Sequence, residues 1–406
     1  MQAPDSATAS THFFRREHYR RFMKFKDINF RPEIHTALEE MGYTELSPIQ
    51  NQTLLAIIER RDIVAIAETG SGKTSACGIP LIHLIDEQLK AIQVLVMVPT
   101  RELAQQYLDE LDRIGKYTKV STVAVFGGVP ANPQRQLIKH GAQLVVATPG
   151  RLIDLLHTGE ISFKHLQTLV LDEADEMLNM GFLEDVEFIM SCIVTPHQTL
   201  LFSATMPKDL DHLIHKFLHD PERIQLNATE VAPRSIAHEF IYSATGHGRE
   251  EFLVTFLQDR SNYRQVLVFC NSRFKGDHLY RALRRSIPRS EYLHGGMDQD
   301  ARTRIFNRFK SGDLPILIAT DVAGRGLDFS NVSHVINFDF PRDEISYTHR
   351  TGRTGRMGRS GVALSYVTDR DIPNCFRIIE KNGISPLWHG EVPSPHTTER
   401  PRRFHR

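Results

Sequence analysis

One lysine, one threonine and two adjacent carboxylates have the residue types and the order that suit hydrolysis of a nucleoside triphosphate. Lys73 and Thr74 close a small-residue turn, 67–74, that follows an apolar run. In such a turn the backbone N–H groups bind phosphates, the lysine reaches the β- and γ-phosphates, and the hydroxyl binds Mg²⁺. The expected nucleotide-binding residues are Thr69, Gly70, Ser71, Gly72, Lys73 and Thr74. Ala67 stands where the general pattern has glycine.

The two carboxylates belong to the segment Asp172-Glu173-Ala174-Asp175, which also follows an apolar run. Asp172 at the end of a buried strand would hold the magnesium ion, and Glu173 would polarise the attacking water. Taken alone, an acidic pair is more typical of an exposed strand end with solvated charge. Its place after the phosphate-binding turn favours catalysis, with Lys73, Asp172 and Glu173 as catalytic residues.

The apolar runs of the sequence predict the strands and helices that hold these residues. Short β-rich runs alternate with helical patterns in two series. The runs of the first are Ile63–Ile66, Val94–Val98, Val123–Phe126, Leu144–Ala147, Leu169–Leu171 and Leu200–Phe202, and those of the second are Val266–Phe269, Ile316–Ala319, Val335–Phe338 and Val362–Val367. Near-continuous apolar strands between helices predict parallel sheets that are covered on both faces. The fold class is therefore α/β, with two tandem doubly wound domains. A ligand would bind at the carboxyl ends of the strands or in a cleft between the domains.

Length and composition agree with two domains in a globular protein. A chain of 406 residues exceeds the size at which one hydrophobic core keeps growing. The formal net charge is zero, so nucleic acid would have to bind at local basic clusters. The predicted parts are a flexible basic tail (1–24), a first domain (25–228), a linker (229–235), a second domain (236–387) and a second flexible basic tail (388–406).

Further segments extend the pattern along most of the chain, from Phe25 to Ile384. They include Ser47-Pro48-Ile49-Gln50, Pro99-Thr100-Arg101-Glu102-Leu103-Ala104, Ser203-Ala204-Thr205, and His349-Arg350-Thr351-Gly352-Arg353-Thr354-Gly355-Arg356. Together with the two segments above, they resemble the motifs of the DEAD-box RNA helicase family. That resemblance implies two RecA-like domains.

The resemblance also assigns residues to the nucleotide. Phe25 would stack on the adenine, and Gln50 would read the edge of that base. Asp328 would face the ribose, while Arg353 and Arg356 would reach the γ-phosphate from the second domain. In phosphoryl transfer, arginines delivered in this way can be worth about 10³ to 10⁵ in rate. The family therefore implies ATP and Mg²⁺ as cofactors.

A third set of residues would face RNA. By resemblance, these are Pro99, Thr100, Arg101, Gly128, Thr148, Arg151, Gln299, Arg302 and Thr320. Ser203 and Thr205 would couple ATP hydrolysis to strand separation. An alternative for these two hydroxyls is helix capping.

The resemblance implies an RNA-stimulated ATPase that separates short RNA duplexes, or remodels RNA–protein complexes, by bending one strand. One alternative is an ATP-gated RNA clamp that serves as an assembly platform, and another is a DNA-translocating helicase. The expected partners are RNA, with little sequence specificity, and protein regulators. We expect a monomer without a membrane segment, located in the cytoplasm, with the nucleus or an organelle as open alternatives.

Overall fold

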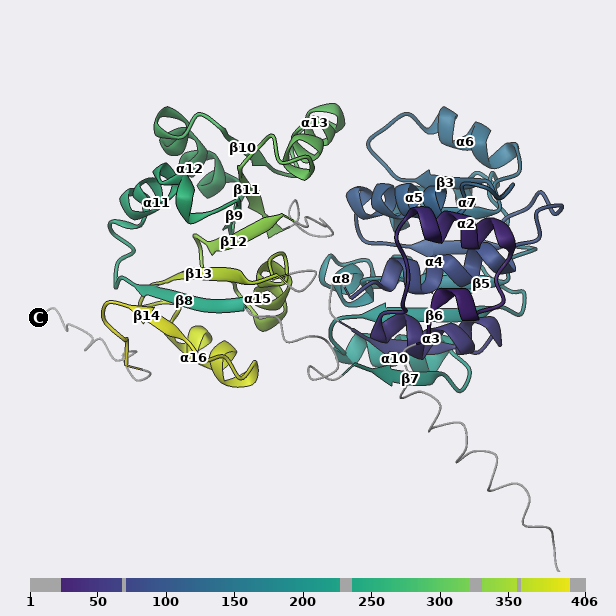
Figure 1. Ribbon diagram of the computed structural model, residues 1–406. Helices are drawn as coiled ribbons and strands as arrows, with labels where there is room; N and C mark the ends of the chain where they lie inside the picture. The colour runs from purple at the N-terminus through teal and green to yellow at the C-terminus, as the bar shows by residue number, and fades with distance from the viewer. Residues whose placement is uncertain (1–22, 68–70, 227–235, 322–330, 356–358, 395–406) are drawn as a thin grey trace, which may run out of the picture. The chain divides into compact units, whose positions relative to one another are not determined.

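The computed structural model describes residues 23–67, 71–226, 236–321, 331–355 and 359–394. The chain divides into two compact units, residues 1–231 and 232–406, and each unit contains one sheet of seven strands (Figure 1). The predicted linker, 229–235, lies outside the described residues. Within the described ranges, no helix is both long enough and apolar enough to cross a membrane.

The sheet of the first unit is parallel and has the strand order β3-β4-β2-β5-β6-β1-β7. Its strands are β1 (Ile63–Ile66), β2 (Val94–Met97), β3 (Thr122–Val125), β4 (Leu144–Ala147), β5 (Thr168–Leu171), β6 (Gln198–Ser203) and β7 (Glu222–Gln225). The helices are α2 (Pro32–Glu40), α3 (Pro48–Ile58), α4 (Lys73–Leu84), α5 (Arg101–Ile114), α6 (Ala131–Lys139), α7 (Pro149–His157), α8 (Ala174–Asn179), α9 (Leu183–Ser191) and α10 (Lys208–Phe217).

Helices cover both faces of this sheet, which explains why its central strands are apolar throughout. In β1, Ile63 and Ala65 belong to the core shared with α2 to α5. Val64, which points to the opposite face, belongs to the core shared with α7 to α10. Because every residue of such a strand meets a helix layer on one face or the other, alternation of polar and apolar residues is lost.

The second unit repeats this architecture with the strand order β10-β11-β9-β12-β13-β8-β14, again in parallel. Its strands are β8 (Ile236–Tyr242), β9 (Gln265–Cys270), β10 (Ser290–Leu293), β11 (Ile316–Thr320), β12 (Val332–Asn337), β13 (Gly361–Val367) and β14 (Leu387–His389). The helices are α11 (Arg249–Gln258), α12 (Arg273–Ser286), α13 (Gln299–Lys310), α15 (Glu344–Thr351) and α16 (Ile372–Lys381). The predicted α/β class with doubly wound sheets is therefore confirmed.

Four strands have no counterpart among the predicted apolar runs: β7, β8, β10 and β14. In β7 the sequence Glu-Arg-Ile-Gln buries only its isoleucine, because the strand forms a sheet edge. At the edge of the second sheet, β14 pairs with β8 and reaches His389. This strand spans position 387, the predicted end of the second domain.

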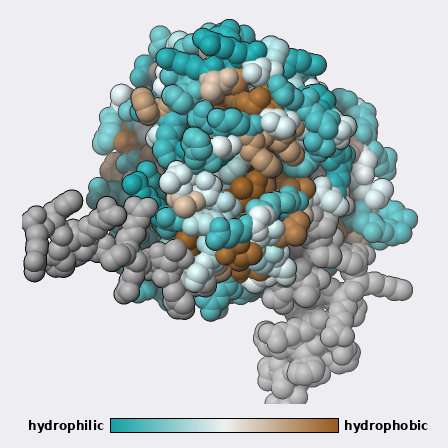
Figure 2. Space-filling model, turned by 90° about the vertical axis from the view of Figure 1, so that its left-hand side faces the viewer, coloured by the Kyte–Doolittle hydropathy of each residue, from teal (hydrophilic) through white to brown (hydrophobic). Residues whose placement is uncertain are grey.

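Figure 2 shows the side of the second unit that carries α11 and β14. Hydrophilic residues cover most of this face, and apolar residues gather in separate patches between them. The exposed apolar side chains of α11 and β14 include Phe252 and Leu387. Scattered residues of this kind are normal on protein surfaces. The predicted phosphate-binding and acidic residues lie instead after the carboxyl ends of β1 and β5.

Candidate nucleotide and RNA site

The phosphate-binding turn joins β1 to α4, and Lys73 is the first residue of that helix. Gly72 has a φ of 93°, and a Cβ there would lie 3.2 Å from Ser47 Oγ, so glycine suits both the backbone and the space. Lys73 is buried, and its Nζ donates to the Ala67 carbonyl at 3.0 Å. Thr74 follows in the first turn of α4. Thr69 and Gly70 lie outside the described residues.

The acidic segment begins where β5 ends and lies close to this turn. Asp172 Oδ1 accepts a hydrogen bond from Glu173 N at 2.8 Å and lies 3.8 Å from Lys73 Nζ. Both side chains of this ion pair are about 5% exposed or less. Glu173 has left-handed backbone angles, φ 52° and ψ 47°, and precedes α8. The fold thus brings Lys73, Asp172 and Glu173 together from two strands that are separated only by β6.

A tyrosine that no sequence motif indicates completes this cluster. Tyr107 on α5 is fully buried, and its hydroxyl donates to Asp172 Oδ2 at 2.5 Å. Cys77 Sγ lies 3.8 Å from the same hydroxyl. Burial, and then the Asp172 carboxylate, raise the pKa of Tyr107 well above its usual value, so the group remains a protonated donor at neutral pH.

The chemistry of these groups fits a magnesium nucleotide. The Thr74 hydroxyl and the Asp172 carboxylate are hard oxygen donors of the kind that Mg²⁺ prefers. No group of three or more His, Cys, Asp or Glu residues in the described part of the chain could hold a metal ion. Mg²⁺ commonly binds through one or two carboxylates, with water and substrate phosphates as its remaining ligands. The donor set therefore fits a metal ion that arrives with a nucleotide.

The other end of the acidic segment is tied to the loop after β6. Asp175 is fully buried, and its Oδ2 accepts hydrogen bonds from Thr205 N at 2.9 Å and Thr205 Oγ1 at 2.7 Å. Ser203 Oγ donates to the Thr205 carbonyl at 2.6 Å. The next helix, α10, begins after Pro207 without a side-chain cap. The two hydroxyls therefore bind within this loop and its acidic neighbour, and they do not cap α10.

The two residues predicted to bind adenine lie in different surroundings. Phe25 is buried, its ring meets the Tyr43 ring edge-on at 5.5 Å, and both line a cavity. Gln50 does not line that cavity. Its Oε1 accepts from Ser47 N at 2.7 Å, and its Nε2 donates to Ser75 Oγ at 3.0 Å. In this conformation Gln50 links the start of α3 to α4.

The predicted RNA-facing residues of the first unit gather where β2, β3 and β4 end. Pro99 and Thr100 follow β2, and Thr148 follows β4. Thr100 Oγ1 caps α5 by accepting from Leu103 N at 3.3 Å. A Cβ at Gly128, where φ is 81°, would overlap the Arg101 guanidinium, so these two residues are in close contact.

Arg151 joins this group from α7. Its Nη2 donates to the Val129 carbonyl at 3.1 Å, and its Nη1 donates to Gln134 Oε1 at 3.3 Å. Because β3, β4 and β2 are neighbours, Arg101 and Arg151 both lie at the end of the sheet formed by the carboxyl ends of its strands.

Three further predicted RNA-facing residues lie near the carboxyl ends of strands in the second sheet. Thr320 ends β11, and Gln299 begins α13 after β10. Arg302 on α13 is largely buried, and its Nη1 donates to the His294 carbonyl at 3.4 Å. Because β10 and β11 are neighbours, these residues share one edge of the sheet.

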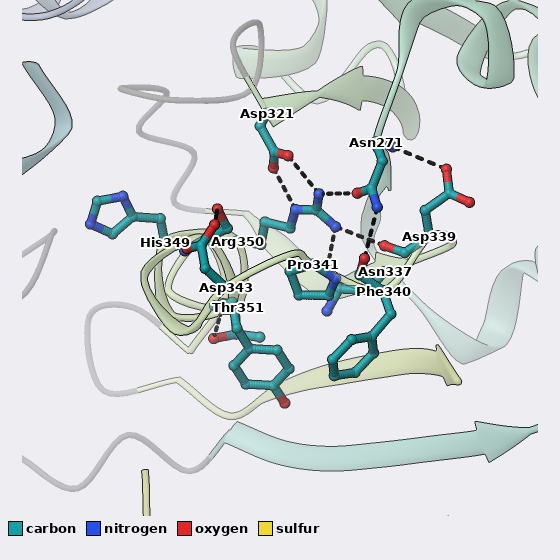
Figure 3. A network of polar contacts seen from close by, with 12 residues as sticks. Asn271, Asp321, Asn337, Asp339, Phe340, Pro341, Asp343, His349, Arg350 and Thr351 are labelled. Carbon is teal, nitrogen blue, oxygen red and sulfur yellow. Dashed lines mark hydrogen bonds and ion pairs between the residues drawn. The ribbon is translucent and has the colours of Figure 1, made fainter. Parts of the chain in front are cut away.

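Arg350 on α15 is the centre of a polar network at the same edge (Figure 3). Its Nε and Nη2 donate to the two carboxylate oxygens of Asp321 at 2.5 and 2.6 Å. Nη2 also donates to Asn271 Oδ1 at 2.6 Å, and Nη1 donates to the Asp339 carbonyl at 2.8 Å. One buried guanidinium thereby joins the ends of β9, β11 and β12. Arg350 belongs to one of the motifs quoted from the sequence, but the family resemblance implied no role for it.

Arg353 follows α15 and is buried, with its Nε donating to the His349 carbonyl at 3.1 Å. Two other predicted nucleotide contacts of this unit, Asp328 and Arg356, lie outside the described residues. The role predicted for Arg353 at a γ-phosphate therefore stays a prediction.

The fold and the cluster around Lys73 define an ATPase class of protein with two RecA-like domains. Residues 47–213 match the DEAD/DEAH box helicase family, and residues 248–358 match the helicase conserved C-terminal domain. The DEAD-box ATP-dependent RNA helicase CshA of Geobacillus kaustophilus is 41% identical over 349 residues, which cover 86% of this chain and 74% of that protein. The chain therefore belongs to the DEAD-box ATP-dependent RNA helicase family.

Solved structures of the yeast protein Dbp5 are similar throughout. S. cerevisiae Dbp5 bound to RNA and ADP BeF3 is 27% identical with a TM-score of 0.82, over 90% of this chain and 95% of that chain. A Dbp5 variant bound to a Gle1 variant and IP6 is 26% identical with a TM-score of 0.72, over 91% of this chain and 95% of that chain. These similarities and the two seven-stranded sheets confirm the RecA-like fold.

Proposed function

We propose that this protein is an RNA-stimulated ATPase that separates short RNA duplexes, or remodels RNA–protein complexes, by bending one strand locally. The observation that carries this proposal is the acidic segment after β5. Asp172 at its start lies 3.8 Å from Lys73, and Asp175 at its end accepts two hydrogen bonds from Thr205. A change in the bound phosphates can therefore be transmitted to the loop after β6 through the four consecutive residues 172–175.

The catalytic roles follow from the chemistry of the groups. Lys73 would bind the β- and γ-phosphates, and Glu173 would orient the attacking water and accept its proton. Thr74 and Asp172 would hold Mg²⁺, which neutralises charge on the phosphate oxygens when it is bound. Arg353 and Arg356 would stabilise charge on the γ-phosphate. Catalysis would then require both units.

In this proposal Phe25 and Gln50 determine which nucleotide base is bound. The Phe25 ring lines a cavity, and a side-chain amide can both donate to and accept from an adenine edge. Gln50 would have to exchange one of its contacts, with Ser47 or Ser75, for the base. We expect ATP to be hydrolysed faster than GTP, with a smaller difference in Gln50→Ala.

The RNA-facing residues of both units complete the proposal. Their predicted targets are phosphates and sugars, so RNA would bind with little sequence specificity. Because a Dbp5 variant binds a Gle1 variant in one similar structure, the proposal includes protein regulators as partners of this chain. We further propose that the protein acts as a monomer in the cytoplasm.

Duplex separation and RNA-stimulated hydrolysis test the proposal together. The protein should separate a short RNA duplex in the presence of ATP and lose efficiency as the duplex is lengthened. RNA should stimulate hydrolysis more than DNA of the same sequence. A protein that holds RNA in the presence of ATP without separating a short duplex would instead be the RNA clamp, and equal stimulation by DNA would favour a DNA-translocating helicase.

A further inference from the structure

Tyr107 occupies a position on α5 at which the fold requires only an apolar side chain. The buried residues Leu103, Tyr107, Leu111 and Ile114 recur at three- and four-residue spacing and pack into the core of the first unit. Phenylalanine would fill the same volume without placing a hydroxyl in this core. A buried hydroxyl is unfavourable unless it has a hydrogen-bond partner, so the partner of Tyr107 indicates the function of the group.

Of its two partners, Cys77 Sγ lies 3.8 Å away, and the much closer one is Asp172, the carboxylate that follows β5. The Tyr107 hydroxyl lies 2.5 Å from Asp172 Oδ2, a distance typical of a hydrogen bond to a charged oxygen. Asp172 Oδ1 accepts from Glu173 N at 2.8 Å. Each carboxylate oxygen therefore has its own donor, from a helix on one side and from the backbone on the other. Two donors at separate oxygens fix the plane of the carboxylate.

The Tyr107 hydroxyl is a neutral donor, and this is important because Asp172 would bind a cation. Lys73 already supplies a positive charge 3.8 Å from Asp172 Oδ1. A second positive charge would oppose metal binding, whereas a hydroxyl can hold the carboxylate without adding charge. Outer partners that orient metal ligands typically affect metal affinity or activity by 10–100-fold, as a rough guide.

We propose that Tyr107 is a positioning residue for the magnesium nucleotide, because its hydroxyl fixes the orientation of the Asp172 carboxylate. The inference rests on the proposed function in one respect, namely that Asp172 holds Mg²⁺. Tyr107 itself touches neither the metal ion nor the nucleotide in this proposal. Its effect should therefore be seen in the metal dependence of nucleotide binding, and not in nucleotide binding as such.

The test compares Tyr107→Phe with the wild type in binding of a fluorescent ADP, with saturating Mg²⁺ and with EDTA. In the wild type Mg²⁺ should strengthen ADP binding. In Tyr107→Phe this strengthening should fall by about tenfold, at the lower end of the usual range for such partners, while affinity in EDTA stays unchanged. The Mg²⁺ concentration that half-saturates hydrolysis should rise in parallel.

A matched control removes a buried tyrosine hydroxyl elsewhere. Tyr263 lies in the second unit, and its hydroxyl donates to the Leu257 carbonyl at 2.6 Å. Tyr263→Phe should leave the Mg²⁺ effect unchanged, even if the protein becomes less stable. An equal loss of ADP affinity with and without Mg²⁺ in Tyr107→Phe would show a structural role and overturn the proposal, and so would a Mg²⁺ effect of wild-type size.

A comparison in an Asp172→Asn background provides a second test, which remains valid if Tyr107→Phe unfolds more easily. In an Asp172→Asn background the carboxylate that Tyr107 orients is gone, so adding Tyr107→Phe should produce no further loss of the Mg²⁺ effect. Additive losses would mean that Tyr107 acts by another route and would overturn the proposal. A wild-type protein whose ADP affinity ignores Mg²⁺ would overturn the metal assignment itself, together with this inference.

Discussion

At the scale of single residues, the phosphate site is held together by opposite charges that are buried next to each other. Lys73 and Asp172 lie 3.8 Å apart with side-chain exposures of 5% and 4%. Removing one partner of a buried pair leaves the other charge without compensation, which usually destabilises a protein. Lys73→Ala would therefore affect folding as well as phosphate binding. Glu173 is the better residue for a test of catalysis.

Glu173→Gln should stop hydrolysis and leave nucleotide binding intact. The amide keeps the shape of the side chain but cannot accept the proton of the attacking water, and a lost general base typically lowers the rate by about 10² to 10⁴. Steady-state hydrolysis and binding of a fluorescent ADP measure the two effects separately. Glu184→Gln, an exposed glutamate on α9, is the matched control. Hydrolysis near the wild-type rate would remove Glu173 from the mechanism.

The difference between Lys73 and Tyr107 shows which site residues a sequence can reveal. Lys73 and Asp172 each follow an apolar run that predicts a buried strand, so their place at a sheet edge could be inferred. Tyr107 has the spacing of a core residue on an amphipathic helix. Its partner is 65 positions away, and nothing in the local pattern marks the contact.

At the scale of elements, the same contrast separates central strands from edge strands. β4 is buried along its length and β1 along all but its last residue, and their apolar runs predicted both strands with correct ends. β7 and β14 each lie at the edge of a sheet and are mostly exposed, so they carry no continuous apolar run. Their positions are set by pairing with β1 and β8, which is a tertiary property.

The loop after β6 offers a test of how hydrolysis is coupled to strand separation. Thr205→Val removes the Oγ1 bond to Asp175 and keeps the backbone N–H bond. A hydrogen bond to a charged group contributes about 1.5–3 kcal/mol, so the link should weaken without disappearing. We expect fewer duplexes separated per ATP hydrolysed, with RNA-stimulated hydrolysis largely kept.

Thr53→Val is the control for this change, because Thr53 Oγ1 is also buried and donates to the Ile49 carbonyl within α3. This variant should leave the ratio of duplexes separated to ATP hydrolysed unchanged. If hydrolysis and separation fall in parallel in Thr205→Val, the loop has a structural role only.

The network around Arg350 predicts that the stability of the second unit depends strongly on this one side chain. Arg350→Met removes a buried charge that Asp321 and two other strand ends contact, and breaking such a pair typically destabilises by about 3–5 kcal/mol. Chemical unfolding of the full chain measures this loss. RNA affinity should fall as well, because Thr320 precedes Asp321 at the end of β11.

Arg281→Met supplies the comparison, because Arg281 pairs with Asp277 on the surface of α12 with 78% of its side chain exposed. Exposed pairs of this kind contribute only about 0–1 kcal/mol. Similar unfolding free energies for the two variants would show that the Arg350 network is not important for stability.

At the scale of the whole molecule, the predicted nucleotide and RNA contacts are divided between two units. Lys73 and Arg101 belong to the first, whereas Arg353 and Thr320 belong to the second. A ligand that contacts both units orders them for the other ligand, so ATP and RNA should strengthen each other's binding. We expect a coupling free energy of about 1–3 kcal/mol.

RNA affinity with and without a non-hydrolysable ATP analogue measures this coupling, at fixed salt because phosphate contacts depend on salt. Arg353→Ala should reduce the coupling and nearly abolish hydrolysis, whereas Arg281→Ala should change neither. Identical RNA affinities in the two conditions would exclude cooperation between the units and, with it, the role of Arg353.

The backbone at Glu173 is left-handed, with φ 52° and ψ 47°. A residue other than glycine in that conformation is unfavourable by about 1–3 kcal/mol, and asparagine tolerates it better than glutamate. A library that contains every substitution at position 173, selected for heat resistance alone, should therefore be enriched in Glu173→Asn and Glu173→Gly, and these survivors should be inactive. The persistence of glutamate at such a position would then record a continuing demand for turnover.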